Sequence, residues 1–423
     1  MSGPSNLSLW DETSEEPDTG SPMVADVVTD VAIVGGGFTG LSAALHAAEK
    51  GLDCCVLEAQ QVGFGGSGRN VGLVNAGLWL PPQDVRAKLG GERGARLVDL
   101  LGDGPAYVMS LIERHQIRCE LTRSGTIHAA HSAGGFKDLS RRAEEWIRLG
   151  APVSLLTKQE AADKIGSDAF HGGLLDARAG TINPMGYVRG LARAAKAAGA
   201  RIHIGVQVTK LTRQAGHWVL ETNQGKVTAK SVILATNAYS DDLWPGLKSS
   251  FVPIDYFQVA TVPLIGRISS ILPERQGIWD TGKIMFSLRR DAAERLIIGS
   301  MGASIGGSNG LSERWAARQL RRLFPDLGQV EFETSWHGQI AMTADHLPRI
   351  HRLDEGLYTP IGYNGRGIAP GTVFGKAMAD LLAGGNEADL PMPVTGVQPE
   401  TARGLKTGFY QIAFAANQMF KSI

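Results

Sequence analysis

The sequence has few cysteines, no net charge and no long apolar run. Its 423 residues contain three cysteines, none in a CxxC or Cys/His spacing, so neither a zinc site nor a redox dithiol is predicted and no metal is expected. Basic and acidic residues both number 42, whereas nucleic-acid binders carry a basic excess. No apolar run approaches the roughly 18 residues of a membrane helix. Nucleic-acid and membrane roles are therefore not expected.

The N-terminal segment also lacks basic residues, because the first lysine or arginine is Lys50. A secretory signal or transit peptide needs basic residues near its start, whereas all the charged side chains of residues 1–30 are acidic. We expect residues 1–28 to form a loosely ordered arm that Leu7, Leu9 and Trp10 dock on the body. Cysteines in apolar surroundings fit a reducing compartment, so the expected location is the cytoplasm.

Glycine is abundant by contrast, with 54 residues, and its densest cluster predicts a nucleotide site. A short apolar strand from residue 29 leads into a GxGxxG turn, a helix follows over 38–50, and a second strand over 53–58 ends in an acid. The glycines permit a tight turn, close approach to a pyrophosphate and close helix packing, and the terminal acid accepts bonds from ribose hydroxyls. The residues assigned to this unit are Gly35, Gly37, Phe38, Thr39, Gly40 and Glu58.

Three later segments indicate which dinucleotide is bound. Glycine-rich residues 63–72 follow the first unit, residues 232–239 lie at mid-chain, and residues 362–370 run into a late helix. A chain that returns three times to one elongated ligand fits FAD better than a nicotinamide cofactor.

These segments resemble the D-amino-acid oxidase superfamily of FAD enzymes, and most closely its gamma-glutamylputrescine oxidase-like branch. The resemblance spans about residues 29–385. It rests on the Gly-Ser-Gly-Arg-Asn stretch 66–70, on Trp336-His-Gly338 with Thr343, Asp345 and Leu347-Pro348, and on the turn 362–367.

The resemblance implies further cofactor contacts. A loop near the pyrophosphate and flavin would contain Ser67, Gly68, Arg69 and Asn70. Val208 would contact adenine, and Thr236, Asn237 and Ala238 would lie near the adenosine half. The flavin N1–C2=O edge would meet a turn and helix start made of Gly362, Asn364, Gly365, Arg366, Gly367 and Ile368. A helix start there stabilises the negative charge of reduced flavin.

Covalent attachment of the flavin is not expected. Family members that attach it through cysteine have that residue near the position of residues 340–342, and this sequence has none there. Members that use an early histidine have it in the loop that here reads Ser-Gly-Arg-Asn. The predicted cofactor is non-covalent FAD.

Four residues are candidates for the catalytic side of the site. Arg366 occupies a place where relatives often have histidine; we favour contact with the reduced flavin, and the alternative is a substrate carboxylate. Tyr256 offers a hydroxyl to the substrate, and Arg289 offers an anion site. His337 is equally compatible with a structural role, and Trp79 is expected to wall the pocket.

The expected fold is α/β, with a Rossmann-like FAD-binding domain and a discontinuous second domain built on a mostly antiparallel sheet. The FAD-binding domain is assigned to 29–85, 150–245 and 345–390, and the substrate domain to 86–149 and 246–344. The tail 391–423 carries an amphipathic helix. Its apolar face is expected to pack on the body or on a second subunit, so a homo-oligomer is possible, and consists of Phe409, Ile412, Ala413, Ala416, Phe420 and Ile423.

The predicted function is oxidation of a C–N bond in a small amine or amino acid. Hydride would pass to flavin N5, and the resulting imine would hydrolyse. The lysine that assists oxygen reduction in related oxidases is replaced near Gly299 by isoleucine. The electron acceptor, oxygen or a carrier, is therefore open. The alternatives are a dehydrogenase that passes electrons to a quinone or carrier protein, and a flavin-holding assembly protein without turnover.

Overall fold

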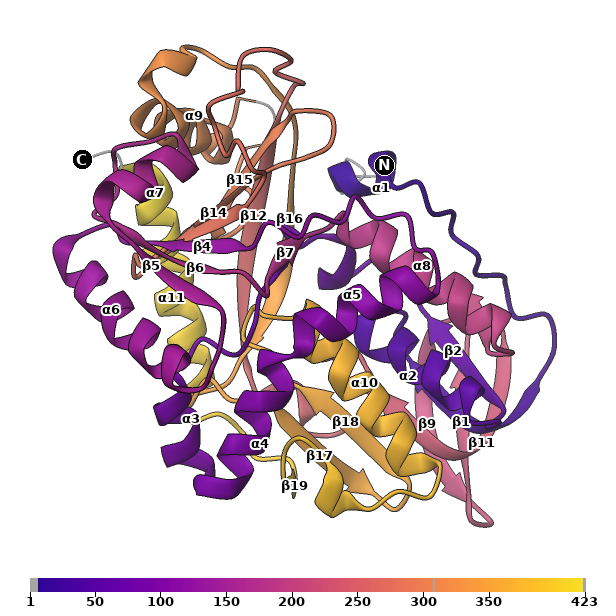
Figure 1. Cartoon of the computed structure of the whole chain (residues 1–423). Coiled ribbons are helices and arrows are strands. Elements are labelled where there is room, and N and C mark those ends of the chain that lie inside the picture. The colour runs from indigo at the N-terminus through magenta and orange to yellow at the C-terminus, as the bar shows by residue number, and fades with distance from the viewer. Residues whose placement is uncertain (1–6, 307–308, 421–423) are drawn as a thin grey trace.

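Two large β-sheets form the framework, and the chain passes between them several times (Figure 1). The computed structural model describes residues 7–306 and 309–420. Within them the fold is the predicted α/β class, with a Rossmann-like sheet and a second, mostly antiparallel sheet. Residues of both sheets line one cavity, which holds the candidate site.

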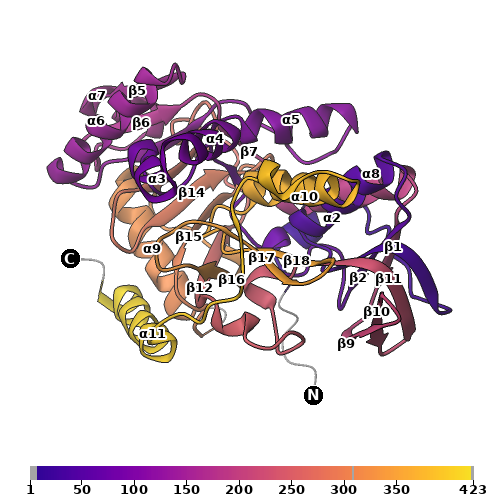
Figure 2. The ribbon, with the colours of Figure 1, turned by 90° about the horizontal axis from the view of Figure 1, so that it is seen from below.

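The first sheet has nine strands and a parallel centre. β1 pairs in parallel with β2 and β11, β2 with β8, and β11 with β18. β1 and β2 are mostly apolar because three helices cover one face (Figure 2) and an apolar cluster beneath the β9–β10 hairpin covers the other. The strands are β1 (Val27–Val34), β2 (Cys54–Glu58), β8 (Arg201–Ile204), β9 (Val208–Gln214), β10 (His217–Thr222), β11 (Gly225–Leu234), β17 (Arg349–Asp354), β18 (Leu357–Ile361) and β19 (Val394–Thr395); the helices are α2 (Phe38–Glu49), α8 (Pro184–Ala197) and α10 (Ile368–Leu382).

The second sheet has eight strands, and every neighbouring pair except β13–β4 is antiparallel. Two of its strands, β5 and β6, come from the segment 150–245 that the sequence assigned to the FAD-binding domain. β6 pairs with β4 and β5 pairs with β6, and no local pattern in the sequence reveals this pairing. The strands are β4 (Thr126–Ala129), β5 (Val153–Leu156), β6 (Gly173–Asp176), β12 (Val252–Thr261), β13 (Gly277–Asp280), β14 (Phe286–Arg290), β15 (Leu296–Met301) and β16 (Phe332–Met342).

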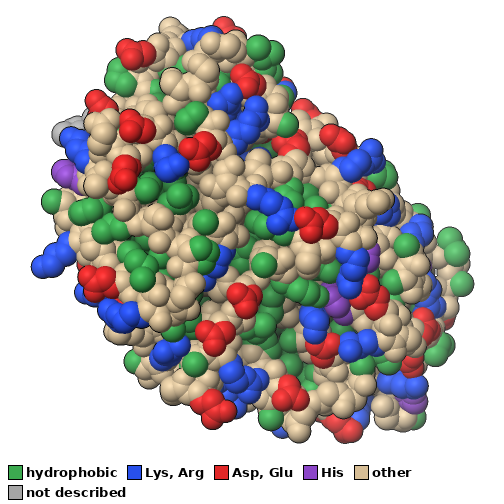
Figure 3. Space-filling model, viewed as in Figure 1, with side chains coloured by type: hydrophobic (Ala, Val, Ile, Leu, Met, Phe, Trp, Pro, Cys, Tyr) green, Lys and Arg blue, Asp and Glu red, His purple; other side chains and the backbone are tan. Residues whose placement is uncertain are grey.

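The remaining elements connect or flank the two sheets. β3 (Leu73–Val74) and β7 (Gly180–Thr181) form a two-stranded ladder. On the face shown in Figure 3, basic and acidic side chains are interspersed, without a large patch of one sign. No helix within the described ranges is long and apolar enough to span a membrane. The flanking helices are α3 (Pro82–Leu89), α4 (Gly91–Gly102), α5 (Gly104–Arg114), α6 (Ala133–Arg148), α7 (Lys158–Ile165) and α9 (Leu311–Leu323).

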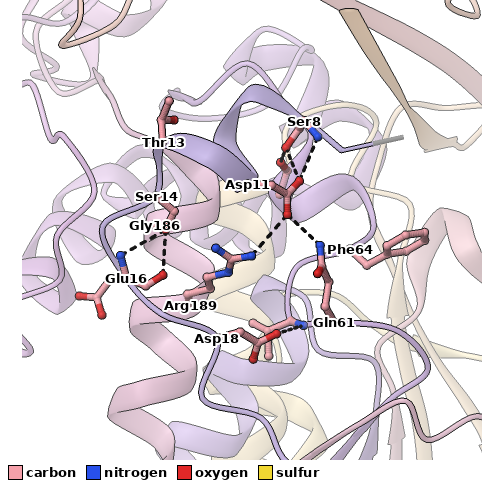
Figure 4. Close-up of polar contacts among 12 residues, drawn as sticks. Ser8, Asp11, Thr13, Ser14, Glu16, Asp18, Gln61, Phe64, Gly186 and Arg189 are labelled. Carbon is pink, nitrogen blue, oxygen red and sulfur yellow. Dashed lines mark hydrogen bonds and ion pairs between the residues drawn. The ribbon is translucent and has the colours of Figure 1, made fainter. Parts of the chain in front are cut away.

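The N-terminal arm is docked more firmly than the sequence predicted. It forms α1 (Leu9–Thr13), whose Leu9 and Trp10 are buried, whereas Leu7 is exposed. The Asp11 carboxylate accepts hydrogen bonds from Gln61 and Arg189, and Asp18 accepts one from the Val62 N–H (Figure 4). The acids that seemed to mark a loose segment therefore attach it to the body.

The C-terminal helix α11 (Arg403–Phe420) packs on α9 and β12 through a face that the sequence did not predict. Phe414 and Gln418 are buried, and Gln418 bonds to Ser312 and to the Ala303 carbonyl. Because Phe414 and Gln418 face α9 and β12, the predicted apolar face points away from the body. The prediction that this face packs on the body is wrong. On the predicted face, Ala413 and Ala416 are half-buried, Ile423 lies outside the described residues, and the exposed members are Phe409, Ile412 and Phe420.

Candidate functional site

The glycine turn between β1 and α2 has the geometry that the sequence predicted. Gly35 has φ 110°, and a Cβ there would lie 2.9 Å from the Ala235 carbonyl oxygen. A Cβ at Gly40 would lie 2.0 Å from the Gly35 carbonyl oxygen, so the helix packs on the turn only without a side chain. A Cβ at Gly37 would lie 2.8 Å from the Ser67 hydroxyl oxygen. The backbone therefore lines the cavity directly at the start of α2.

Glu58 lies beside this turn at the end of β2. Its Oε2 accepts a hydrogen bond from the Gly36 N–H at 2.7 Å, and its Oε1 accepts one from the Gln60 N–H at 2.9 Å. Burial raises the pKa of this carboxyl, although these two N–H donors partly offset the effect. Each oxygen retains acceptor capacity toward the cavity, as ribose recognition requires.

A second helix start faces the same cavity. The turn 362–367 leads into α10, and Gly367 and Ile368 line the cavity together with the first residues of α2. The two helices pack closely: the Thr39 hydroxyl lies 2.9 Å from the Tyr363 hydroxyl, and a Cβ at Gly375 would lie 2.4 Å from the Thr39 carbonyl oxygen. Two helix N-termini thus favour negative charge in one cavity.

The cavity has a volume of about 480 Å³ and joins the glycine turn to the second sheet. It brings together most of the predicted residues. Six predicted cofactor residues are not part of the lining: Gly40, Gly68, Arg69, Ala238, Gly362 and Asn364. The predicted residues that line it are Gly35, Gly37, Phe38, Thr39, Glu58, Ser67, Asn70, Trp79, Val208, Thr236, Asn237, Tyr256, Gly365, Arg366, Gly367 and Ile368.

Arg69 is a structural link rather than part of the cavity lining. Its guanidinium donates to the carbonyl oxygens of Phe64 at 2.6 Å and His337 at 3.0 Å. The Arg69 carbonyl accepts a bond from the Trp336 indole. These contacts tie the loop 63–72 to β16. Ser67, which accepts a hydrogen bond from the Phe38 N–H at 3.0 Å, ties the same loop to α2.

The four catalytic candidates separate into two groups. Tyr256 and Arg366 line the cavity; burial raises the pKa of Tyr256 well above its ordinary value, so its phenol stays protonated. Arg289 lies outside the lining, beneath Trp10, and donates to the Ile182 carbonyl. His337 also lies outside it, on β16 opposite Phe257. Neither position supports the substrate contact predicted for Arg289 or His337.

A row of residues across the second sheet forms a wall that the sequence did not reveal. Gln258 pairs with Gly299, Gly299 with Ser287, and Ser287 with Trp279, so four neighbouring strands present one face. All four residues line the cavity, and the Gln258 amide lies over Gly299, where a Cβ would be 2.3 Å from the Gln258 Oε1. The buried Gln258 Oε1 has no hydrogen-bond partner among the described residues. Strand register alone aligns this row, so no local signal in the sequence marks it.

The donor set fits FAD. The glycine cradle and helix start suit a pyrophosphate, Glu58 suits a ribose, and the cavity continues to the second helix start, where a flavin edge would lie. None of the described cysteines or histidines lines the cavity, which is consistent with a non-covalent flavin.

The fold and site together define a flavin-dependent oxidoreductase. The FAD dependent oxidoreductase (DAO) family matches residues 30–381, and this chain belongs to that family. It is 34% identical over 368 residues to gamma-glutamylputrescine oxidoreductase of Escherichia coli (strain K12), and 33% identical over 364 residues to the probable oxidoreductase OrdL of Rhizobium meliloti (strain 1021). Each match covers 85% of both chains. The crystal structure of glycine oxidase from Geobacillus kaustophilus matches with a TM-score of 0.70 and 25% identity, covering 84% of this chain and 95% of that one.

The family settles one of the predicted alternatives. Its members named above are oxidoreductases and oxidases, so the chain is an FAD-dependent enzyme and not a flavin-holding protein without turnover. The resemblance predicted from the sequence is confirmed. Small amines and amino acids are the substrate types consistent with these relatives.

Proposed function

We propose that this enzyme oxidises a C–N bond of a small amine or amino acid. The relatives named for such substrates support the reaction class. The observation that carries it here is the wall of the second sheet, where Tyr256, Gln258 and Trp279 line the same cavity as the two helix starts. Such a wall can hold a small substrate against a flavin that lies at the second helix start.

FAD held at this site would supply the two-electron acceptor for a hydride from the substrate carbon. The nitrogen lone pair forms the C=N bond as the hydride leaves, and water then hydrolyses the imine. Residues of this chain need only position a neutral amine and exclude water, because hydride transfer depends on proximity and alignment. Tyr256, Gln258 and Trp279 do this from the second sheet.

The electron acceptor is part of the proposal. No lysine lines the cavity among the residues described, and Ile297 and Ile298 beside Gly299 are fully buried. Oxygen and a carrier are both compatible with this lining. We keep the dehydrogenase as the second candidate because the position that holds the oxygen-activating lysine in related oxidases is apolar here.

Anaerobic mixing tests the function directly. Primary and secondary amines and amino acids are added to the FAD-loaded enzyme without oxygen, and flavin absorbance is followed. Bleaching by an amine, but not by the alcohol of the same carbon skeleton, supports C–N oxidation. If no member of a broad amine and amino-acid panel bleaches the flavin, the proposal is wrong. The reoxidation rate in air then separates the oxidase from the dehydrogenase.

A further inference from the structure

The outer face of α11 is an apolar surface that stays exposed. Phe414 and Gln418 are buried against α9 and β12, and Ile412 lies about 200° around the helix from Phe414, so its side chain points away from the body. Figure 2 shows α11 at the edge of the molecule. The large side chains on this face are between 50% and 79% exposed: Leu405, Phe409, Ile412, Met419 and Phe420.

This surface is large for a single helix. A fully exposed side chain of this size presents about 150–200 Å², so these side chains together offer roughly 600 Å² per subunit. A monomeric protein seldom exposes a contiguous apolar patch beyond a few hundred Å², whereas a standard interface buries about 800 Å² on each partner. The outer face of α11 therefore supplies most of the area that a stable interface needs.

The spacing of the apolar residues fits pairing with another helix. Five residues follow one another at intervals of four, three, four and three positions, which is the heptad spacing of a coiled-coil seam. Gly408, Ala413 and Ala415 lie beside this line, and their small side chains allow a second helix to approach closely. We call the five residues the outer seam: Leu405, Phe409, Ile412, Ala416 and Met419.

The charges of α11 favour a second copy of the chain over a lipid surface. A helix that lies on a membrane presents lysine and arginine to anionic headgroups. The two basic residues of α11 are instead bonded within the chain. The Arg403 Nε donates to the Phe251 carbonyl at 2.9 Å, and the Lys406 Nζ lies 3.1 Å from a Glu400 carboxylate oxygen. The seam itself is uncharged, so two copies of it meet without repulsion.

The order of large and small residues in the seam favours an antiparallel pair. In a parallel pair each seam residue meets its own copy, so Ala416 meets alanine and a gap remains. In an antiparallel pair Ala416 meets a larger residue of the partner helix, which fills that gap. Gln418 already holds α11 on the body through Ser312 and the Ala303 carbonyl, so pairing costs little conformational entropy.

We propose that two copies of this chain associate through the outer seam, with the two α11 helices antiparallel about a twofold axis near the middle of the helix. The interface is isologous, because both subunits use the same surface. A second subunit was one of the two places that the sequence predicted for the tail. The inference is independent of the proposed function, because none of the seam residues lines the cavity.

Sedimentation equilibrium of the FAD-loaded full chain tests the association. We expect the wild type to be dimeric at micromolar concentration. Ile412→Lys places like charges in the seam and should raise the dissociation constant of the dimer by at least about a hundredfold. Ile412→Leu should remain dimeric, because it keeps the apolar side chain. Flavin retention in Ile412→Lys shows that the separated subunits are folded.

Ile265→Lys is the matched control, because Ile265 is 78% exposed and Ile412 is 75% exposed, but Ile265 lies outside α11. The dissociation constant should not change in this variant. A wild type that is monomeric at every concentration, or an Ile412→Lys variant that is as dimeric as the wild type, overturns the proposal. If the monomeric wild type binds phosphatidylglycerol vesicles and Ile412→Lys does not, the seam faces a lipid surface and the proposal is wrong.

Cross-linking through introduced cysteines tests the direction of the pair. The three native cysteines are buried, so a thiol on α11 reacts selectively. Ile412→Cys lies near the twofold axis and should be joined to its copy by a short bismaleimide. Leu405→Cys lies near one end of the seam, so its two copies approach each other only in a parallel pair. Efficient cross-linking of Leu405→Cys, with none of Ile412→Cys, overturns the antiparallel arrangement.

Discussion

The arginine that holds the N-terminal arm and the arginine in the cavity wall have different partners. Arg193 on α8 donates to both carboxylate oxygens of Glu16, at 2.8 Å each, and the Glu16 side chain is fully buried. Arg366 in the cavity wall donates only to backbone carbonyls and otherwise contacts indole rings. The arm pairs its buried charge with an opposite charge, whereas the cavity wall surrounds its cation with backbone carbonyls and indole rings.

The same contrast holds for the aromatic residues of the two regions. The Trp10 indole N–H donates to the Asn70 carbonyl at 2.9 Å, whereas the Trp279 indole N–H has no hydrogen-bond partner among the described residues. A fully satisfied network stabilises the fold, and an unsatisfied one adjoining a cavity lowers stability in exchange for binding. Substitutions in the arm should therefore affect stability most, and substitutions in the wall should affect affinity most.

The largest expected effect comes from Trp10→Ala. Trp10 is fully buried, packs edge-on against Trp336 at 5.9 Å and holds the loop 63–72 through Asn70. Its removal should lower the free energy of unfolding by about 3–5 kcal/mol and weaken flavin retention. Chemical denaturation and the flavin released on dilution measure the two effects. Phe409→Ala, at an exposed aromatic of α11, should change the stability of a single subunit by less than about 0.5 kcal/mol.

Arg193→Met should have the next largest effect. It leaves the Glu16 carboxylate buried with only the Arg118 N–H as a donor, so we expect a loss of about 3 kcal/mol. Lys230→Met removes an exposed ion pair with Asp30 and should have a much smaller effect, because solvent screens the pair. Similar losses for the two variants would show that the Glu16–Arg193 pair adds little.

The pH dependence of the arm follows from Glu16. Burial alone would raise its pKa, but hydrogen bonds from Arg193 and the Arg118 N–H outweigh burial, and the pKa is lowered. A lowered carboxyl pKa gives stability that is complete above the unfolded value and is lost as pH falls through the folded value. The difference in stability between the wild type and Arg193→Met should therefore shrink below about pH 4. Denaturation at neutral and acidic pH measures it, and a constant difference would contradict the assignment.

Among the buried positions, the smallest stability effect is expected for Arg366→Met. No described carboxylate is left unpaired by this change, and methionine fits between indole rings, so the ligand-free protein should lose less than about 1 kcal/mol. Chemical denaturation of the wild type and the variant measures the difference. A large loss of stability without ligand would mean that Arg366 supports the fold as Arg193 does.

Local patterns were sufficient to predict the dinucleotide half of the site. The turn at Gly35–Gly40, the acid Glu58 and the turn 362–367 all lie where the sequence placed them, because each depends on residues close together in the chain. The domain assignment, the cytoplasmic location and the oligomeric state remain predictions. Local reasoning failed for Arg289 and His337, since strand neighbours far along the chain place them outside the cavity.

By itself the sequence determined the chemistry of the cofactor: glycines where backbone must approach a phosphate, an acid at a strand end, and helix starts after both turns. Only the tertiary structure decided the substrate wall. Gln258, Ser287 and Trp279 are aligned by the register of four strands, and Arg366 meets Trp79 and Trp279 because two separate loops converge there. Register and loop convergence depend on packing across the whole chain, so the residues of this cavity wall come together only once the chain is folded.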